Sequence, residues 1–210
     1  MGDWKGYIDI AAFWTEYYNM MEFTFGNYNP TLTTAPYGLG FQSQNIGNTR
    51  IKGIDFSIMG QGKIGPINVN LLLGYTYIDP IQTDFNLAKD TVINNSAKTN
   101  ILKYRYKQSG KADVELGYKK VFTGISMRAN SFMENVDGIF VNDYFFPGVK
   151  KYRADHDQGD YIFDYRLSYQ LNKTAKLSFI INNMFNREVM GRPMDIQAPR
   201  VYAFQLTVKI

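Results

Sequence analysis

The sequence has no cysteine and only one histidine, and these absences exclude several classes of protein. Without cysteine the chain cannot form disulfides, thiolate zinc sites or iron–sulfur clusters, and it has no cysteine nucleophile. With His156 as the only imidazole it cannot build a multi-histidine metal centre, and we predict no catalytic residue, no metal site and no cofactor. The net charge of +4 is spread without a run of like charges, so we expect no nucleic-acid partner.

Long apolar runs are also missing, whereas aromatic residues are abundant. No stretch approaches the roughly 18 consecutive apolar residues of a transmembrane helix. The N-terminal residues MGDWKGYIDI lack the basic and apolar regions of a secretory signal. The 210 residues include 16 Tyr, 15 Phe and 2 Trp. Many strands with one apolar and one polar face account for this composition better than a helical bundle does.

Apolar and polar residues alternate along several segments. Between Tyr161 and Leu171 the odd positions are aromatic or aliphatic and the even positions are mostly polar. Between Leu102 and Lys119 the even positions are mostly apolar and their odd neighbours are mostly charged. A strand separates two such sets onto opposite faces, whereas a helix scatters them. The pattern predicts eight strands, at residues 4–25, 45–60, 67–79, 99–119, 124–140, 159–171, 176–186 and 199–210.

The connections between these strands alternate between long and short. Long ones fall near 26–44, 80–98, 141–158 and 187–198, and short ones near 61–66, 120–123 and 172–175. In an antiparallel meander every second connection lies at the same end, so the long loops share one end. Transmembrane β-barrels have this arrangement, with short periplasmic turns and long external loops. We predict an all-β fold, an antiparallel up-and-down transmembrane β-barrel segment; a soluble all-β binding module is the alternative.

In a membrane barrel the apolar set faces lipid and the charged set faces the interior. Aromatic residues near strand ends are expected at the two membrane interfaces: Tyr75, Tyr77, Tyr118, Phe122, Tyr161 and Tyr202. The expected interior set is Lys103, Arg105, Asp113, Glu115, Arg128, Asp164 and Arg166. A barrel of eight strands is only just filled by side chains, which leaves little room for so many long charged ones. We therefore expect residues 1–210 to be the C-terminal part of a larger barrel.

Several segments carry a family resemblance in a consistent order along the chain: NIGNTRIKGID (45–55), LGYTYIDP (73–80), NNMFNREV (182–189), MGRP (190–193) and APRVYAFQLTVKI (198–210). Together they resemble the TonB-dependent receptors of Gram-negative outer membranes, in particular those of Bacteroidetes type. The resemblance implies the last eight strands of a plugged barrel of about 22 strands. It also implies location in the cell outer membrane and import of a nutrient such as a siderophore or glycan, not an enzymatic activity.

The same resemblance implies a set of partners. These are outer-membrane lipid, the rest of the barrel with its plug domain, TonB acting through the missing N-terminal part, and the nutrient ligand. The plug domain and the segment that contacts TonB have no counterpart in this chain.

Three segments are candidates for a binding or catalytic site. GQGKIG at 60–65 matches the glycine pattern of dinucleotide-binding loops, but Pro66 and another strand follow it, so we predict a tight turn. RADHDQGD at 153–160 could bind a cation or supply an Asp–His pair to an outer-membrane barrel enzyme; the alternative is a solvated turn that opens the sixth strand. The aromatic loop near 26–44 could contact ligand or serve in loop–loop packing. The candidate ligand contacts are Tyr28, Tyr37, Phe41, Asp155, His156 and Asp157.

Overall fold

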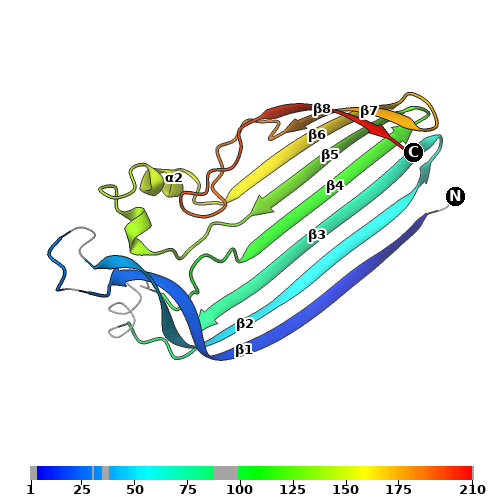
Figure 1. Cartoon of the computed structure of the whole chain (residues 1–210). Coiled ribbons are helices and arrows are strands. Elements are labelled where there is room, and N and C mark those ends of the chain that lie inside the picture. The colour runs from blue at the N-terminus through cyan, green and yellow to red at the C-terminus, as the bar shows by residue number, and fades with distance from the viewer. Residues whose placement is uncertain (1–3, 30, 35–37, 88–98, 210) are drawn as a thin grey trace.

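The computed structural model describes residues 4–29, 31–34, 38–87 and 99–209, and these residues form one antiparallel sheet of eight strands in sequential order (Figure 1). This confirms the predicted up-and-down fold. The strands are β1 (Lys5–Asn27), β2 (Leu39–Ile64), β3 (Ile67–Gln82), β4 (Gln108–Tyr118), β5 (Val121–Asn130), β6 (Asp160–Gln170), β7 (Ala175–Asn182) and β8 (Val201–Val208). Between β5 and β6 lie a 3-10 turn, η1 (Gly138–Val141), and a short helix, α2 (Val149–Asp155). Among the described residues no helix is long and apolar enough to cross a membrane.

Tight turns and long connections lie at opposite ends of the sheet. The turn end holds the short connections 65–66, 119–120 and 171–174 together with both chain termini (Figure 1). The GQGKIG segment ends in one of these turns, where Gly65 has a φ of +57° that favours glycine. The longer connections, with η1 and α2, lie at the other end, which we call the loop end. The predicted rhythm of the connections is therefore confirmed.

The strand register sorts the side chains into an apolar face and a polar face. One row of opposed residues crosses six strands on the apolar face, from Val69 through Leu116, Thr123, Leu167 and Phe179 to Phe204. Large apolar side chains on this face are open to the surroundings: Leu167 is 40% exposed and Phe204 is 77% exposed. The face is continuous because the side-chain period of two is kept in register from strand to strand.

The polar face carries the charged residues that were predicted to lie together. Arg166 donates to both carboxylate oxygens of Asp113 at 2.7 Å, and it donates to Glu115 at 3.4 Å. Arg128 and Asp164 pair at 3.3 Å on the same face. These contacts join β4, β5 and β6, and they confirm the shared face for these five residues.

The structure corrects the fourth and fifth predicted strands. β4 begins at Gln108 instead of residue 99, and β5 ends at Asn130 instead of residue 140. Tyr104 has a φ of +57°, a left-handed conformation that interrupts a regular strand. The neighbours Leu102 and Lys103 are both 3% exposed, so they do not alternate between two faces. Lys103 and Arg105 therefore do not belong to the polar face of a strand. They lie in an irregular segment, residues 99–107.

Smaller differences occur at other strand ends. β1 and β2 form a hairpin that extends further toward the loop end than predicted, since β2 begins at Leu39 instead of residue 45. β7 ends at Asn182 instead of residue 186. Asn183 and Asn186 follow it with φ of +50° and +51°, and asparagine tolerates this left-handed conformation better than most residues do.

Candidate functional site

A groove opens at the loop end, where parts of the chain far apart in sequence meet. Its volume is about 490 Å³, within the range of roughly 300–1,000 Å³ typical of small-molecule sites. Five segments line it: the loop-end part of β1, β2, residues 99–107, η1 and the connection before β8. The lining residues are Met20, Met21, Glu22, Phe23, Phe41, Tyr104, Arg105, Phe140, Arg192 and Pro193.

Aromatic rings form much of the groove wall. Phe140 lies with its ring centroid 6.0 Å from that of Phe41 and 6.3 Å from that of Tyr104. Phe41 is also in edge contact with Phe25 at 5.3 Å. These contacts connect the β1–β2 hairpin with η1 and with the 99–107 segment. A ligand in the groove would therefore meet several rings at once.

Two arginines give the groove positive charge. Arg105 is 3.6 Å from the carboxylate of Glu22, and its side chain is 34% exposed. Arg192 is exposed and forms no ion pair within the described residues. A guanidinium group presents a planar set of N–H donors that suits carboxylate, phosphate or other anionic oxygens. The groove thus combines apolar surface with donors for a negatively charged group.

A buried ion pair joins the 99–107 segment to the residues just before η1, next to the groove. Lys103 Nζ is 2.7 Å from Asp137 Oδ1, and the side chain of Asp137 is fully buried. Tyr104 donates its hydroxyl to the other oxygen of the same carboxylate. Burial, together with that hydrogen bond, raises the pKa of Tyr104 well above its usual value, so the hydroxyl stays a donor. This network holds Tyr104 and Arg105 against the connection that carries Phe140.

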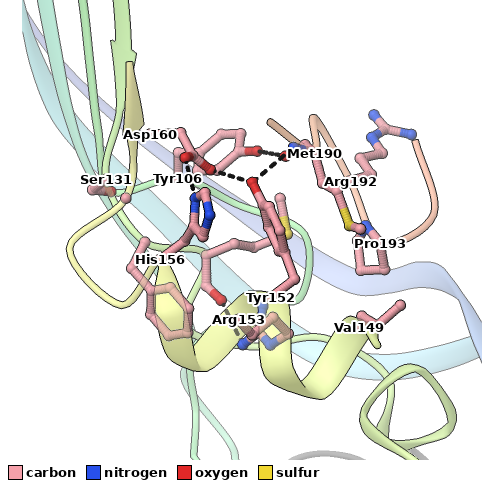
Figure 2. Close-up of a pocket in the computed structure, with 13 residues that line it drawn as sticks. Tyr106, Ser131, Val149, Tyr152, Arg153, His156, Asp160, Met190, Arg192 and Pro193 are labelled. Atoms are coloured by element: carbon pink, nitrogen blue, oxygen red, sulfur yellow. Dashed lines mark hydrogen bonds and ion pairs between the residues drawn. The ribbon is translucent and has the colours of Figure 1, made fainter. Parts of the chain in front are cut away.

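A second, much smaller cavity lies beside α2 and is shown in Figure 2. Tyr152 donates to Asp160 Oδ2 at 2.5 Å, and His156 Nδ1 lies 2.5 Å from Asp160 Oδ1. The rings of Tyr152 and His156 stack 4.0 Å apart. Met190 donates its backbone N–H to the Tyr152 hydroxyl at 2.8 Å. These contacts bind α2, the start of β6 and the connection before β8 together.

The volume of this inner cavity is about 40 Å³, enough for one or two waters and not for a nutrient. Burial, and next the hydrogen bond to Asp160, raises the pKa of Tyr152 above its usual value. Burial lowers the pKa of Arg153, which donates to the backbone oxygen of Met133 at 2.9 Å. Tyr152, His156, Asp160 and the backbone of Met190 are linked by hydrogen bonds. The cavity is therefore a hydrogen-bonded joint between loops.

The structure separates the predicted acidic cluster. Asp155 ends α2 and pairs with Lys151 at 2.5 Å, and Asp157 is exposed and accepts from Gln158. Of the candidates Asp155, His156 and Asp157, only His156 lines the inner cavity, where its partner is Asp160. The expected solvated turn is present, because residues 156–158 form a turn between the end of α2 and the start of β6, and Asp157 and Gln158 are exposed. In the described ranges no three His, Cys, Asp or Glu side chains gather in a way that could hold a metal ion.

The predicted aromatic loop residues have different positions. Phe41 lines the groove. Tyr28 donates its hydroxyl to the backbone oxygen of Thr24 at 2.7 Å and is part-buried, so it packs within the hairpin. Tyr37 lies outside the described residues.

Of the ten residues that line the groove, sequence reasoning had named only Phe41 as a ligand contact. Glu22, Tyr104, Arg105 and Phe140 all fell inside predicted strands. For Tyr104 and Arg105 the reason is that the alternation of residues 102–107 fits a strand as well as it fits this loop. MGRP was the available signal, since its Arg192 and Pro193 line the groove. The charges of Lys103 and Asp137 gave no sign of their pairing, because 34 residues separate them.

An antiparallel meander with one apolar face, one polar face, tight turns at one end and long loops at the other defines the wall of a transmembrane β-barrel. Residues 2–184 match the family described as TonB dependent receptor-like, beta-barrel, and the chain belongs to this family. It is thereby placed in the outer membrane of a Gram-negative bacterium. The apolar face meets lipid, and the polar face meets the barrel interior.

Solved receptors share the fold at low sequence identity. The ferric-catecholate import receptor Fiu of E. coli K12 has a TM-score of 0.62 at 16% identity, over 96% of this chain and 25% of that one. BauA, the ferric preacinetobactin receptor of Acinetobacter baumannii, has a TM-score of 0.58 at 17% identity, over 97% and 27%. The copper transporter OprC has a TM-score of 0.53 at 11% identity, over 99% and 28%. The chain thus spans about a quarter of the length of these receptors, and no curated protein matches its sequence.

Proposed function

We propose that this chain forms the C-terminal part of the barrel of a TonB-dependent receptor that imports a nutrient across the outer membrane. The observation that carries the proposal is the groove of about 490 Å³ at the loop end of a sheet that belongs to this family. Transport is an activity of the whole receptor. The plug domain, the remaining strands and TonB are proposed as its partners.

We assign a different role to the loop end, the polar face and the turn end of the sheet. The loop end faces outward and offers Phe41, Tyr104 and Phe140 as contact surface for the ligand. The polar face, with Asp113 and Arg166, lines the interior and offers a hydrated wall to the plug domain. Energy would reach the plug through TonB from the periplasmic side, where the tight turns lie.

The groove favours a ligand that presents both apolar or planar surface and negative charge. Aromatic walls provide the first contact, and Arg105 and Arg192 provide the second. A ferric siderophore of the catecholate type has both properties, whereas a neutral glycan would use the rings alone. We therefore place a ferric siderophore before a glycan as the proposed substrate.

The proposal is tested with the gene for the full-length receptor, deleted and then restored in its host. We expect restoration to rescue TonB-dependent growth on ferric catecholate as the only iron source. The F41A and R105Q variants should lower binding of the same ferric catecholate about tenfold, since one contact of about 1.4 kcal/mol is lost in each. Y144A is the matched control, because Tyr144 is 86% exposed in the same loop region but does not line the groove.

Three results separate the alternatives. Growth that does not depend on the gene or on TonB would contradict the transport function. Rescue on oligosaccharide instead of ferric catecholate would keep transport and overturn the substrate class. Loss of a hydrolytic activity in H156A, with transport unchanged, would favour the outer-membrane enzyme.

A further inference from the structure

Cationic side chains lie over aromatic rings near the ends of the apolar face. Arg50 and Lys52 lie 4.8 and 5.8 Å from the ring centroid of Trp14. At the loop end of β6 and β8, Arg187 lies 4.0 Å from the ring of Tyr161 and Arg200 lies 5.7 Å from the ring of Tyr202. Aromatic and basic side chains of this kind sit where hydrocarbon gives way to lipid headgroups.

The second group lies at the loop ends of β6 and β8, and we call it the β6–β8 patch: Tyr161, Phe163, Phe185, Arg187, Arg200 and Tyr202. Phe163 is in edge contact with Tyr161 at 5.9 Å and with Phe185 at 5.6 Å. Tyr161 and Phe163 belong to the apolar face, because the register puts them on the same side as Leu167. The patch thus has an aromatic floor flanked by two guanidinium groups.

The positive charge of the patch is poorly compensated. Arg187 Nε is buried and has no hydrogen-bond partner, and the nearest carboxylate, Asp160, is 3.9 Å from its Nη2. Both oxygens of Asp160 already bond Tyr152 and His156. Arg200 makes only a long bond of 3.4 Å to a backbone oxygen. Glu188, the sequence neighbour of Arg187, forms no ion pair with either arginine in the described part of the chain.

The lysine near Trp14 is better compensated, since Lys52 pairs with Asp79 at 3.3 Å. Arg50 resembles Arg187, because its Nε is also buried without a hydrogen-bond partner. The matched comparison for the β6–β8 patch is therefore the Lys52–Asp79 pair. Among the residues that the structure describes, the two guanidinium groups of the β6–β8 patch are offset only by one carboxylate at 3.9 Å, and this excess of positive charge favours an anionic partner from outside the chain.

We propose that the β6–β8 patch binds a phosphate-bearing lipid of the outer membrane. The patch belongs to the lipid-facing side of the barrel, so a membrane lipid has direct access to it. The planar guanidinium donors of Arg187 and Arg200 match phosphate oxygens, and the aromatic floor packs against the acyl chains next to the headgroup. Membrane phosphate attracts each nearby basic side chain by an amount that corresponds to about a fivefold gain in affinity.

The test uses the full-length receptor in a neutral detergent and three probes: phosphatidylglycerol, diacylglycerol and inorganic phosphate. Binding is read by native mass spectrometry and by the rise in unfolding temperature during titration. We expect phosphatidylglycerol to bind better than the other two probes. R187Q/R200Q should weaken its binding about twenty-five-fold, the product of two fivefold losses. K52Q, at the compensated Lys52–Asp79 pair, should bind as the wild type does.

Three outcomes would overturn the proposal. Equal binding of diacylglycerol would show that the phosphate is not recognised, and equal binding of inorganic phosphate would show a site for the free anion. Unchanged binding by R187Q/R200Q would remove the role of the patch. R187K/R200K keeps both charges and loses the planar donors, so we expect its affinity to lie between those of the wild type and R187Q/R200Q.

Discussion

Replacing Lys103 by methionine (K103M) tests whether the buried ion pair holds the groove in shape. Asp137 is fully buried, and its Oδ1 would lose a cation 2.7 Å away. Breaking a buried pair by removing one partner costs about 3–5 kcal/mol, because a charge is left uncompensated in the interior. Tyr104 still donates to Asp137, so we expect the lower end, about 3 kcal/mol.

Amide hydrogen exchange in the full-length receptor measures the loss of local stability in the segments that contain Lys103 and Asp137. Local opening of residues 99–107 and 135–141 would become about a hundredfold more frequent, since 1.4 kcal/mol corresponds to a factor of ten. The strands should keep their protection, because their ladders do not include Lys103. Ligand binding should weaken together with the protection, because Tyr104 and Arg105 belong to the same segment.

Two variants control the interpretation. K151Q breaks the pair of Lys151 with Asp155, whose side chains are 78% and 52% exposed, and should change exchange less than about fivefold. K103M/D137L removes both buried charges and should recover most of the lost protection, since an apolar pair replaces a buried ion pair at little cost. Wild-type exchange in K103M, or no recovery in K103M/D137L, would refute the role assigned to the pair.

Three further perturbations have definite expected results. Gly159 has a φ of +91°, and an added Cβ would lie 2.2 Å from a backbone oxygen. In amide hydrogen exchange, G159A should therefore destabilise the connection before β6 by about 2 kcal/mol or more. G148A, at a φ of +88° with open space around the added Cβ, should cost less in the same measurement. L167R puts a cation on the lipid face and should cost about 2–4 kcal/mol of folding free energy near the bilayer midplane. The cost should appear on gels as a smaller heat-modifiable folded fraction. Q205R, on the polar face, should fold normally. Because the pKa of Tyr104 is raised in the folded chain, the stability it contributes is complete below its ordinary pKa of about 10 and is lost as the pH rises further. Ultraviolet titration should show one fewer late-ionising tyrosine in Y104F.

The wall of the barrel was predictable from the sequence because each strand carries its own evidence. Leu116, Leu167 and Phe204 fall on one face through a period of two that is visible in the printed residues. The tight turns were equally local, since Gly65 and Pro66 mark one of them by residue type.

The candidate site was less predictable. Of the predicted ligand contacts that the structure describes, only Phe41 lines the groove, and His156 lies in the inner cavity instead. Whether Phe41 or His156 touches a ligand stays a prediction. The groove depends on contacts between residues that are far apart in sequence, such as Glu22 with Arg105 and Phe41 with Phe140. No local pattern records such contacts.

The sequence by itself determined the number of strands, their order, the two faces and the end at which the loops gather, because alternation and turn residues act over a few neighbouring positions. The tertiary structure alone decided where β4 and β5 stop. Residues 102–107 alternate as a strand does, yet a strand needs a paired neighbour, and the ladder of β4 with β5 ends at Ser109 and Asn130. Beyond that point Lys103 is buried and forms an ion pair with Asp137. This long-range pairing shapes the groove, and no local sequence pattern records it.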